Sequence, residues 1–200
     1  MRNRNRTPVA LSTALCLLIL AAPAAAERNG GEFRVGVGAA PVQTLFELFS
    51  DVTVAALFVG ELEPSTESEQ PAGFIEYVRP MGERSRMIVH FNINSYEKEY
   101  VWKDTGQLAG KVSDDFYTLM MGAKHYYVRT NSFGLYLDAM AGLCLLRSTT
   151  DIDEVETDNH TLLAYQFTPL GMRIGGAAAL DLAVGLGYKG ILSVGFDYEF

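Results

Sequence analysis

The feature that most limits what this chain can fold into lies in its last eleven residues, 190–200. Apolar side chains occupy every second position there, and polar or small residues, with the exception of Ile191, occupy the positions between them. A period of two predicts a β-strand with one apolar face and one polar or crowded face. Because the chain stops on this strand without a covering layer, we interpret it as one strand of a closed barrel whose outward face meets lipid.

The N-terminal segment is typical of an exported protein. Three arginines within the first six residues precede an almost unbroken apolar run at 10–22 and three alanines at 24–26. This order of charge, apolar run and small residues predicts a cleaved secretory signal peptide. We therefore predict a signal peptide at 1–26 and one β-barrel domain at 27–200, a length that suits a single domain.

Charge and cysteine content exclude several other classes of protein. The predicted mature chain keeps 13 of the 16 basic residues and all 24 acidic ones, which argues against nucleic acid as a partner. It also keeps one cysteine, Cys144, so no disulfide can form within it. The longest apolar run after the signal peptide, 52–59, is far shorter than the roughly 20 residues of a spanning helix. A membrane location therefore requires a β-barrel.

Seven further segments carry strand signals. They cover residues 33–38, 73–79, 86–96 with an open outer end, 116–128, 133–146, 161–174 and 177–188. With the last strand they make eight, and the connections alternate between short turns and long polar loops, as in barrels with short periplasmic turns and long external loops. The sequence thus predicts an all-β, eight-stranded antiparallel up-and-down transmembrane β-barrel.

Two local features interrupt the strand pattern. The apolar alternation slips by one position at Pro169, which predicts a β-bulge. In the first long connection, polar residues recur at helical spacing after Pro41, so we predict a short helix from 42 to about 59 in the first external loop. The alternative is a strand at 52–59, which would make nine.

Three segments of the second half, 117–143, 165–176 and 183–200, resemble small eight-stranded outer-membrane β-barrel proteins of Gram-negative bacteria with an OmpA/OmpX-like architecture. The resemblance implies an outer-membrane location, and the family has no single shared activity. The chain end is similar to the C-terminal signal that outer-membrane assembly machinery reads, which implies a recognition role for Leu192, Val194, Phe196, Tyr198 and Phe200. The implied partners are this machinery, outer-membrane lipids and lipopolysaccharide.

The inward rows of the predicted strands carry polar residues of both charge signs. They are Arg34, Glu76, His90, Lys124, Asp138, Gln166, Arg173, Asp181, Asp197 and Glu199. The interior of an eight-stranded barrel is just wide enough for side chains to fill, and buried charges persist when they are paired. We predict a polar network that plugs the lumen. The alternative is a narrow pore or small-solute conduit.

Catalysis is a second alternative, because some small outer-membrane barrels modify lipids. His160 follows Asp158 in a predicted outer loop, which could imitate an acid–histidine pair. No G-x-S-x-G segment occurs, and the five acids within 151–158 lack the turn glycine of an EF-hand loop. We therefore predict no catalytic, metal or cofactor site, and a structural or surface-interaction role.

Outward aromatic residues are expected at both membrane interfaces. We assign Phe33, Tyr127 and Phe133 to the periplasmic rim, together with the terminal phenylalanine. Tyr117, Tyr165 and Tyr188 are assigned to the outer rim. Trp102 is expected in the second external loop.

Overall fold

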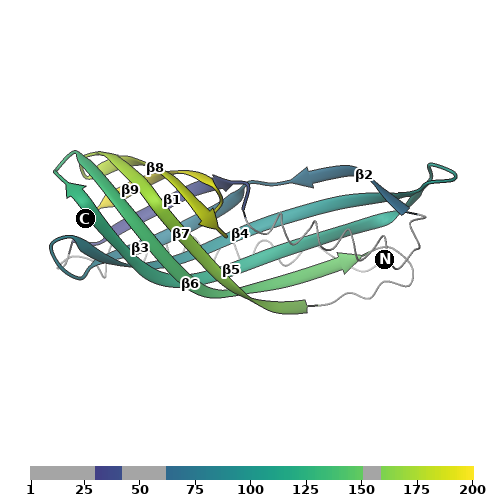
Figure 1. Ribbon diagram of the computed structural model, residues 1–200, viewed down its shortest axis with the longest axis horizontal. Coiled ribbons are helices and arrows are strands. Elements are labelled where there is room, and N and C mark those ends of the chain that lie inside the picture. Colours follow the sequence, from purple (N-terminus) through teal and green to yellow (C-terminus); the bar gives the residue numbers. More distant parts are fainter. Residues whose placement is uncertain (1–29, 42–61, 151–158) are drawn as a thin grey trace.

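A computed structural model of the chain describes residues 30–41, 62–150 and 159–200, and these residues form nine β-strands. All strands except β2 close into an antiparallel barrel (Figure 1). In chain order the strands are β1 (Glu32–Ala39), β2 (Leu62–Glu69), β3 (Ala72–Pro80), β4 (Ser85–Trp102), β5 (Leu108–Arg129), β6 (Phe133–Thr150), β7 (Asn159–Gly175), β8 (Ala178–Gly187) and β9 (Leu192–Glu199). The eight-stranded antiparallel barrel predicted from the sequence is confirmed.

The ring closes between its first and last strands. β1 pairs with β9 along its whole length, from Glu32 opposite Glu199 to Ala39 opposite Leu192. On its other side β1 pairs with β3, and β4 pairs with β5. Every strand of the ring therefore has two hydrogen-bonded neighbours, which removes the open edges that expose a sheet to pairing with other chains.

An extension of the sheet runs beyond the ring at one end. β4, β5 and β6 have 18, 22 and 18 residues, and their outer parts continue past the other strands (Figure 1). β3 pairs with residues 86–93 of β4, whereas β2 pairs with residues 96–102 of the same strand. β2 thus follows the line of β3 along β4 and belongs to this extension.

The prediction of a long external loop after residue 96 is wrong. β4 continues to Trp102, whose N–H donates to the carbonyl of Gln107 at 2.9 Å in a tight turn to β5. Lys98 faces inward and is buried, while Glu97 and Glu99 face outward. Because both faces carry polar side chains here, the apolar alternation disappears from the sequence although the backbone ladder to β2 and β5 continues. Trp102 is therefore the last residue of a strand.

The predicted bulge at Pro169 is confirmed. The pairing of β7 with β8 shifts between Phe167 and Leu170, and Pro169 and Leu170 are both exposed. Proline has no N–H to donate to a ladder, so a bulge is one of the few places where a strand accepts it. Beyond the bulge the inward row resumes with Gly171 and Arg173.

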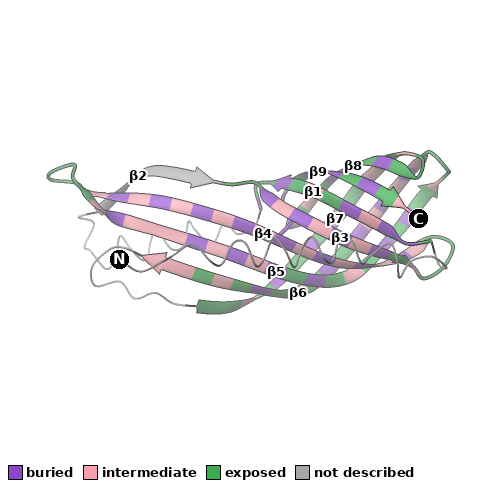
Figure 2. Ribbon diagram, turned by 180° about the vertical axis from the view of Figure 1, so that it is seen from behind, coloured by how far each residue is buried: buried purple, intermediate pink, exposed green. Residues whose placement is uncertain are grey.

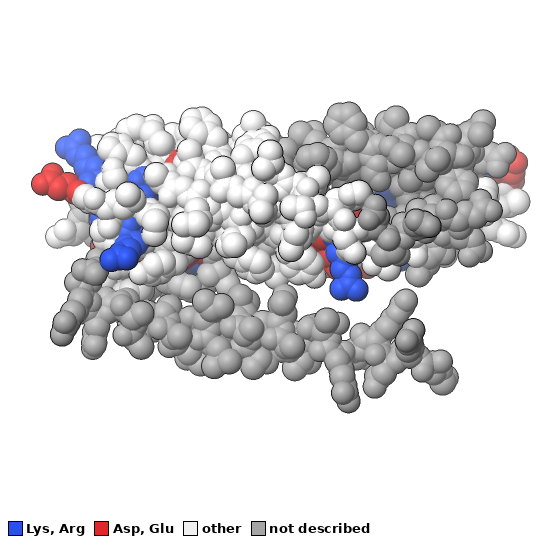
Figure 3. All heavy atoms as spheres, turned by 90° about the horizontal axis from the view of Figure 1, so that it is seen from below, with Lys and Arg blue, Asp and Glu red and all other residues white. Residues whose placement is uncertain are grey.

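Outward side chains of the ring form an apolar belt, and the alternation between this belt and the buried rows is visible along the strands in Figure 2. In Figure 3 a broad band without charged side chains separates the charged residues at one end of the barrel from those farther along. The exposed members of the belt include Val35, Val37, Leu119, Met121, Leu143, Leu145, Leu163, Phe167, Leu170, Ile174, Leu180, Val184, Leu186, Leu192, Val194 and Phe196.

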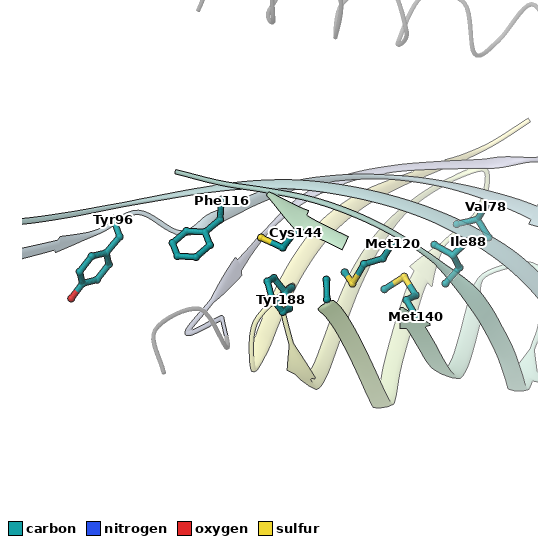
Figure 4. Packing of buried hydrophobic residues seen from close by; sticks show 9 residues of the cluster. Val78, Ile88, Tyr96, Phe116, Met120, Met140, Cys144 and Tyr188 are labelled. Carbon is teal, nitrogen blue, oxygen red and sulfur yellow. The ribbon is translucent and has the colours of Figure 1, made fainter. Parts of the chain in front are cut away.

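Inside the barrel, an apolar cluster lies among the buried polar side chains. Buried apolar side chains from β3 to β7 form a row along the interior, joined by a tyrosine from the β8–β9 turn (Figure 4). The cluster consists of Val78, Ile88, Tyr96, Phe116, Met120, Met140, Cys144, Ala164 and Tyr188. Buried charges lie on both sides of the ring: they include Arg34, Asp181 and Asp197 on β1, β8 and β9, and Glu76, Lys124, Asp138 and Arg173 on strands from β3 to β7.

Three predictions concern residues outside the described ranges. These are the signal peptide at 1–26, the helix from 42 to about 59 and the acidic segment 151–158. Within the described ranges, no helix is both long and apolar enough to cross a membrane.

Candidate functional site

The candidate site is the polar network inside the ring, and Arg34 of β1 is its centre. The Arg34 guanidinium is fully buried and lies 2.8 Å from Glu76, 2.8 Å from Asp181 and 3.4 Å from Asp197. Glu76 and Asp197 are its register partners on β3 and β9. The ladder therefore places two of the three carboxylates, and one guanidinium can serve all of them because it has five N–H donors.

Glycine lets Arg34 reach the third carboxylate. Asp181 lies on β8, opposite Gly195 of the intervening strand β9. A Cβ atom at Gly195 would lie 3.3 Å from both Cγ and Cδ of Arg34. The missing side chain thus leaves room for the arginine stem to pass across β9 toward β8.

Tyr136 of β6 reaches from the other side of the ring to the Arg34 cluster. Its hydroxyl donates to Asp181 at 2.7 Å and accepts from Nη1 of Arg34 at 3.2 Å. Its ring lies against Gly171 of β7, where an added Cβ would come within 2.1 Å of ring atoms. The Lys124 ammonium lies 4.2 Å from the centre of the same ring, a cation–π geometry that is favourable when the cation is desolvated.

Lys189, which was not predicted to lie in the lumen, closes the end of the network at the β8–β9 turn. The turn between β8 and β9 bends into the barrel, and the Lys189 ammonium donates to Glu76 at 2.9 Å. The Lys189 backbone N–H donates to the side chain of Gln166 at 2.9 Å. His90 lies 3.0 Å from the same Glu76 oxygen. One carboxylate of β3 therefore joins the turn to the Arg34 cluster.

The inward turn corrects the prediction that Tyr188 lies in the outer aromatic girdle. Tyr188 is fully buried, and its carbonyl accepts from the Asn92 side chain at 2.7 Å. Gly187 and Gly190 frame the turn with φ values of +143° and +111°, a region that side chains rarely adopt. β8 ends at Gly187, one residue before the tyrosine, and Gly190 follows two residues after it, so this pair of glycines is the sequence signal that could have indicated the inward turn.

A second group of ion pairs lies at the opposite end of the lumen, where the connections are short turns. Fully buried Glu32 lies 3.2 Å from Arg129 and 3.6 Å from Arg86. Arg129 also donates to Glu199 at 2.6 Å. Arg173 contacts Asp197 at 3.3 Å and Glu199 at 3.5 Å. Glu32, Arg86 and Arg129 were not predicted to line the lumen, because they lie at or near strand ends.

All ten residues predicted to line the lumen face the interior. Nine of them are buried, and the Glu199 side chain lies at the rim with 34% of its surface exposed. Lys124 and Asp138 are neighbours in register on β5 and β6. Even so, the Lys124 ammonium and both Asp138 oxygens have no hydrogen-bond partner in the described part of the protein. The structure thus joins eight of the ten through hydrogen bonds or ion pairs.

Buried charge in the described part of the chain is balanced. Six cations and six anions are buried: Arg34, Arg86, Lys98, Lys124, Arg173 and Lys189 against Glu32, Glu76, Asp114, Asp138, Asp181 and Asp197. Removing an ion from water costs several kcal/mol in proteins, so such charges persist when opposite charges and hydrogen bonds compensate them. This balance fits a lumen filled by its own side chains.

The three histidines lie in different parts of the barrel. His90 is buried in the lumen beside Glu76, and His160 lies within β7 rather than in a loop, which corrects its predicted position. His125 is exposed on β5, with its Nδ1 3.2 Å from the Ser85 hydroxyl. The described part of the chain also holds no group of three or more His, Cys, Asp or Glu residues that could bind a metal ion.

The residues of the predicted assembly signal form the outward face of β9 and the chain end that follows it. Leu192, Val194, Phe196 and Tyr198 are exposed on β9, and the Phe200 N–H donates to the Gly31 carbonyl at 3.0 Å. A scan against models of protein families and a search of curated proteins found no match to this chain. The family resemblance and the assembly role therefore stay predictions.

Proposed function

We propose that this protein is an integral outer-membrane β-barrel protein of a Gram-negative bacterium, exported by a cleaved signal peptide. Its role is structural or surface-interacting and does not involve catalysis, and its lumen is plugged by side chains. One observation carries the proposal: the barrel has its apolar residues outside and its charges inside. This inversion is what a closed sheet needs when lipid surrounds it.

The apolar belt supports the membrane location. Leu163 is 82% exposed, and Leu192, Leu145 and Phe196 each expose more than half of their surface. In water a contiguous apolar surface of this kind would promote association with other molecules. Next to hydrocarbon, the same side chains are in their favourable environment, with outer-membrane lipids and lipopolysaccharide as partners.

The ion-pair network supports the plug. Arg34, Tyr136 and Lys189 are large, fully buried side chains that meet near Glu76 from three different parts of the ring. An eight-stranded barrel has an interior that a few such side chains can fill. A closed lumen leaves the parts outside the ring as the places where a partner could bind.

A narrow conduit is the second candidate, and unpartnered polar atoms favour it. Besides Lys124 and Asp138, the hydroxyl of Thr118, Nε2 of His90 and the carbonyl oxygen of the Asn92 side chain have no hydrogen-bond partner in the described part of the chain. Buried polar groups of this kind commonly bind ordered water. A file of such waters would connect the two ends of the lumen.

Two experiments test the proposal in sequence. The first is fractionation of expressing cells with comparison of boiled and unboiled samples by electrophoresis. The proposal expects an outer-membrane protein whose mobility changes on heating, and recovery as a water-soluble monomer would contradict it. The second is planar-bilayer recording. If side chains plug the lumen, we expect no steady conductance, whereas a reproducible small conductance would favour the conduit.

A binding assay tests the surface-interaction role. The turn between β4 and β5 lies at the tip of the extension beyond the ring (Figure 1). Replacing residues 103–107 with a minimal two-residue hairpin turn keeps the barrel unchanged while shortening this tip. If the protein has a role in surface interaction, we expect intact cells that carry the shortened variant to bind host or bacterial surfaces more weakly.

A further inference from the structure

A polar pocket of about 520 Å³ lies at the end of the barrel where the connections are short turns. On one side it is lined by Glu83 and Arg84 from the β3–β4 turn. On the other it is lined by residues 127–131, from the end of β5 and the following turn. The Tyr126 N–H donates to the Arg84 carbonyl at 2.8 Å, so the two turns are held together. A pocket of this volume suits a small polar group.

The pocket lies where the apolar belt ends. On β4 the outward row changes from Val89 and Met87 to Ser85, and on β5 it changes from Ala123 to His125. The Ser85 hydroxyl and the His125 ring are within hydrogen-bond distance of each other at this boundary. In a membrane protein such a change from apolar to polar residues marks the headgroup region.

A bulge presents two neighbouring side chains to the membrane beside the pocket. The pairing of β5 with β6 shifts between Tyr126 and Val128, and Tyr127 and Val128 are both exposed as a result. Both residues also line the pocket. The polar cavity is therefore continuous with an apolar surface, which is the arrangement that an amphipathic ligand requires.

The pocket carries one negative and one positive charge that are free to bind a ligand. Within the described ranges, the side chains of Glu83 and Arg84 make no ion pair or hydrogen bond, and both residues are exposed. Arg129, by contrast, is engaged by Glu32 and Glu199. The available pair is therefore one carboxylate next to one guanidinium.

We propose that this pocket binds the headgroup of a zwitterionic glycerophospholipid that carries a phosphate and a primary amine. Arg84 binds the phosphate, because a guanidinium fork matches phosphate oxygens, and Glu83 accepts the ammonium. The acyl chains lie along Val128 and the apolar belt. Glu83 disfavours a lipid with net negative charge, since its carboxylate would lie near a second anion. This inference rests on the proposed membrane location.

Native mass spectrometry of the full-length protein, purified in detergent, tests the proposal. The protein is titrated with phosphatidylethanolamine and with phosphatidylglycerol of the same acyl chains, which has the phosphate but no amine. We expect phosphatidylethanolamine to bind about ten-fold more tightly than phosphatidylglycerol. Glu83→Gln should remove most of this preference, because it removes the acceptor of the amine, whereas Arg84→Gln should weaken the binding of both lipids about ten-fold, because both carry the phosphate. Arg79→Gln is the matched control, because Arg79 is an exposed arginine near the same end of the barrel outside the pocket.

Equal binding of the two lipids would overturn the proposal, and so would equal losses in the Arg84 and Arg79 variants. Displacement of the lipid by millimolar inorganic phosphate would also overturn it, since the site would then hold free phosphate. Recording the heat-modifiable mobility of each variant distinguishes a failure of the headgroup site from a failure of the membrane location. A protein that inserts normally but shows no lipid preference refutes the headgroup site alone, whereas a protein that does not insert refutes the membrane location.

Discussion

Two buried charge groups within the same lumen differ in how they are compensated. Arg34 contacts three carboxylates from β3, β8 and β9. Lys124 and Asp138 are direct neighbours on β5 and β6, yet they form no ion pair in the described part of the chain. The Lys124 ammonium lies over the Tyr136 ring instead.

The difference teaches that adjacency in a ladder is not sufficient for pairing. A planar guanidinium presents donors in several directions, whereas an ammonium is a compact charge that can approach only one set of groups. On the Arg34 wall the partners come from both neighbouring strands and from the strand beyond. On the Lys124 wall an aromatic ring occupies the place of a carboxylate.

The largest effect is expected for Arg34→Met. The substitution leaves Glu76, Asp181 and Asp197 without the cation that they share, and breaking a buried ion pair by removing one partner costs about 3–5 kcal/mol. Urea unfolding in lipid vesicles, followed by tryptophan fluorescence and by heat-modifiable mobility, measures the change. An unfolding midpoint within error of the unsubstituted protein would show that the Arg34 cluster is not a centre of stability.

A smaller effect is expected for Lys189→Met. Glu76 loses one charged hydrogen bond but keeps Arg34, so the expected loss is about 1.5–3 kcal/mol. Lys103→Met, in the exposed β4–β5 turn, is the matched control and should leave the midpoint unchanged. If both lysine variants lose equal stability, the inward turn between β8 and β9 does not stabilise the barrel through Glu76.

Gly171→Ala tests the support of Tyr136. An added Cβ would come within 2.1 Å of the Tyr136 ring and displace its hydroxyl from Asp181, an overpacking effect of about 1–3 kcal/mol. Gly176→Ala adds the same atom where no other atom lies within 4 Å. The same unfolding assay applies, and a tolerant Gly171 variant would mean that the ring can move without loss of the network.

The smallest loss is expected for the double variant Lys124→Met with Asp138→Asn. Replacing both members of a poorly compensated buried pair is often neutral and can stabilise a protein by about 1–4 kcal/mol. The midpoint should therefore stay unchanged or rise. A fall as large as that of Arg34→Met would abolish the contrast between the two groups and indicate that Lys124 and Asp138 are compensated as well as Arg34.

Much of the lumen was predictable because the period of two assigns each residue to a face. The ten residues predicted to point inward do so, although they come from all eight strands of the ring. The shift at Pro169 was predictable for the same reason, since the alternation itself slips there. Prediction failed in the last residues of β4, because polar side chains on both faces leave no alternation between apolar and polar residues. It also failed at Tyr188, because the turn after β8 bends into the lumen.

The sequence by itself determined the number of ring strands, their faces and the excess of polar residues inside, because all three follow from the local alternation of side chains. Only the tertiary structure decided which charges meet. Arg34 and Tyr136 are 102 residues apart and touch because the ring closes. Lys189 reaches Glu76 because two glycines direct a short turn into the lumen. Contacts across a barrel depend on closure, stagger and turn direction, and these are properties of the whole sheet rather than of any one strand.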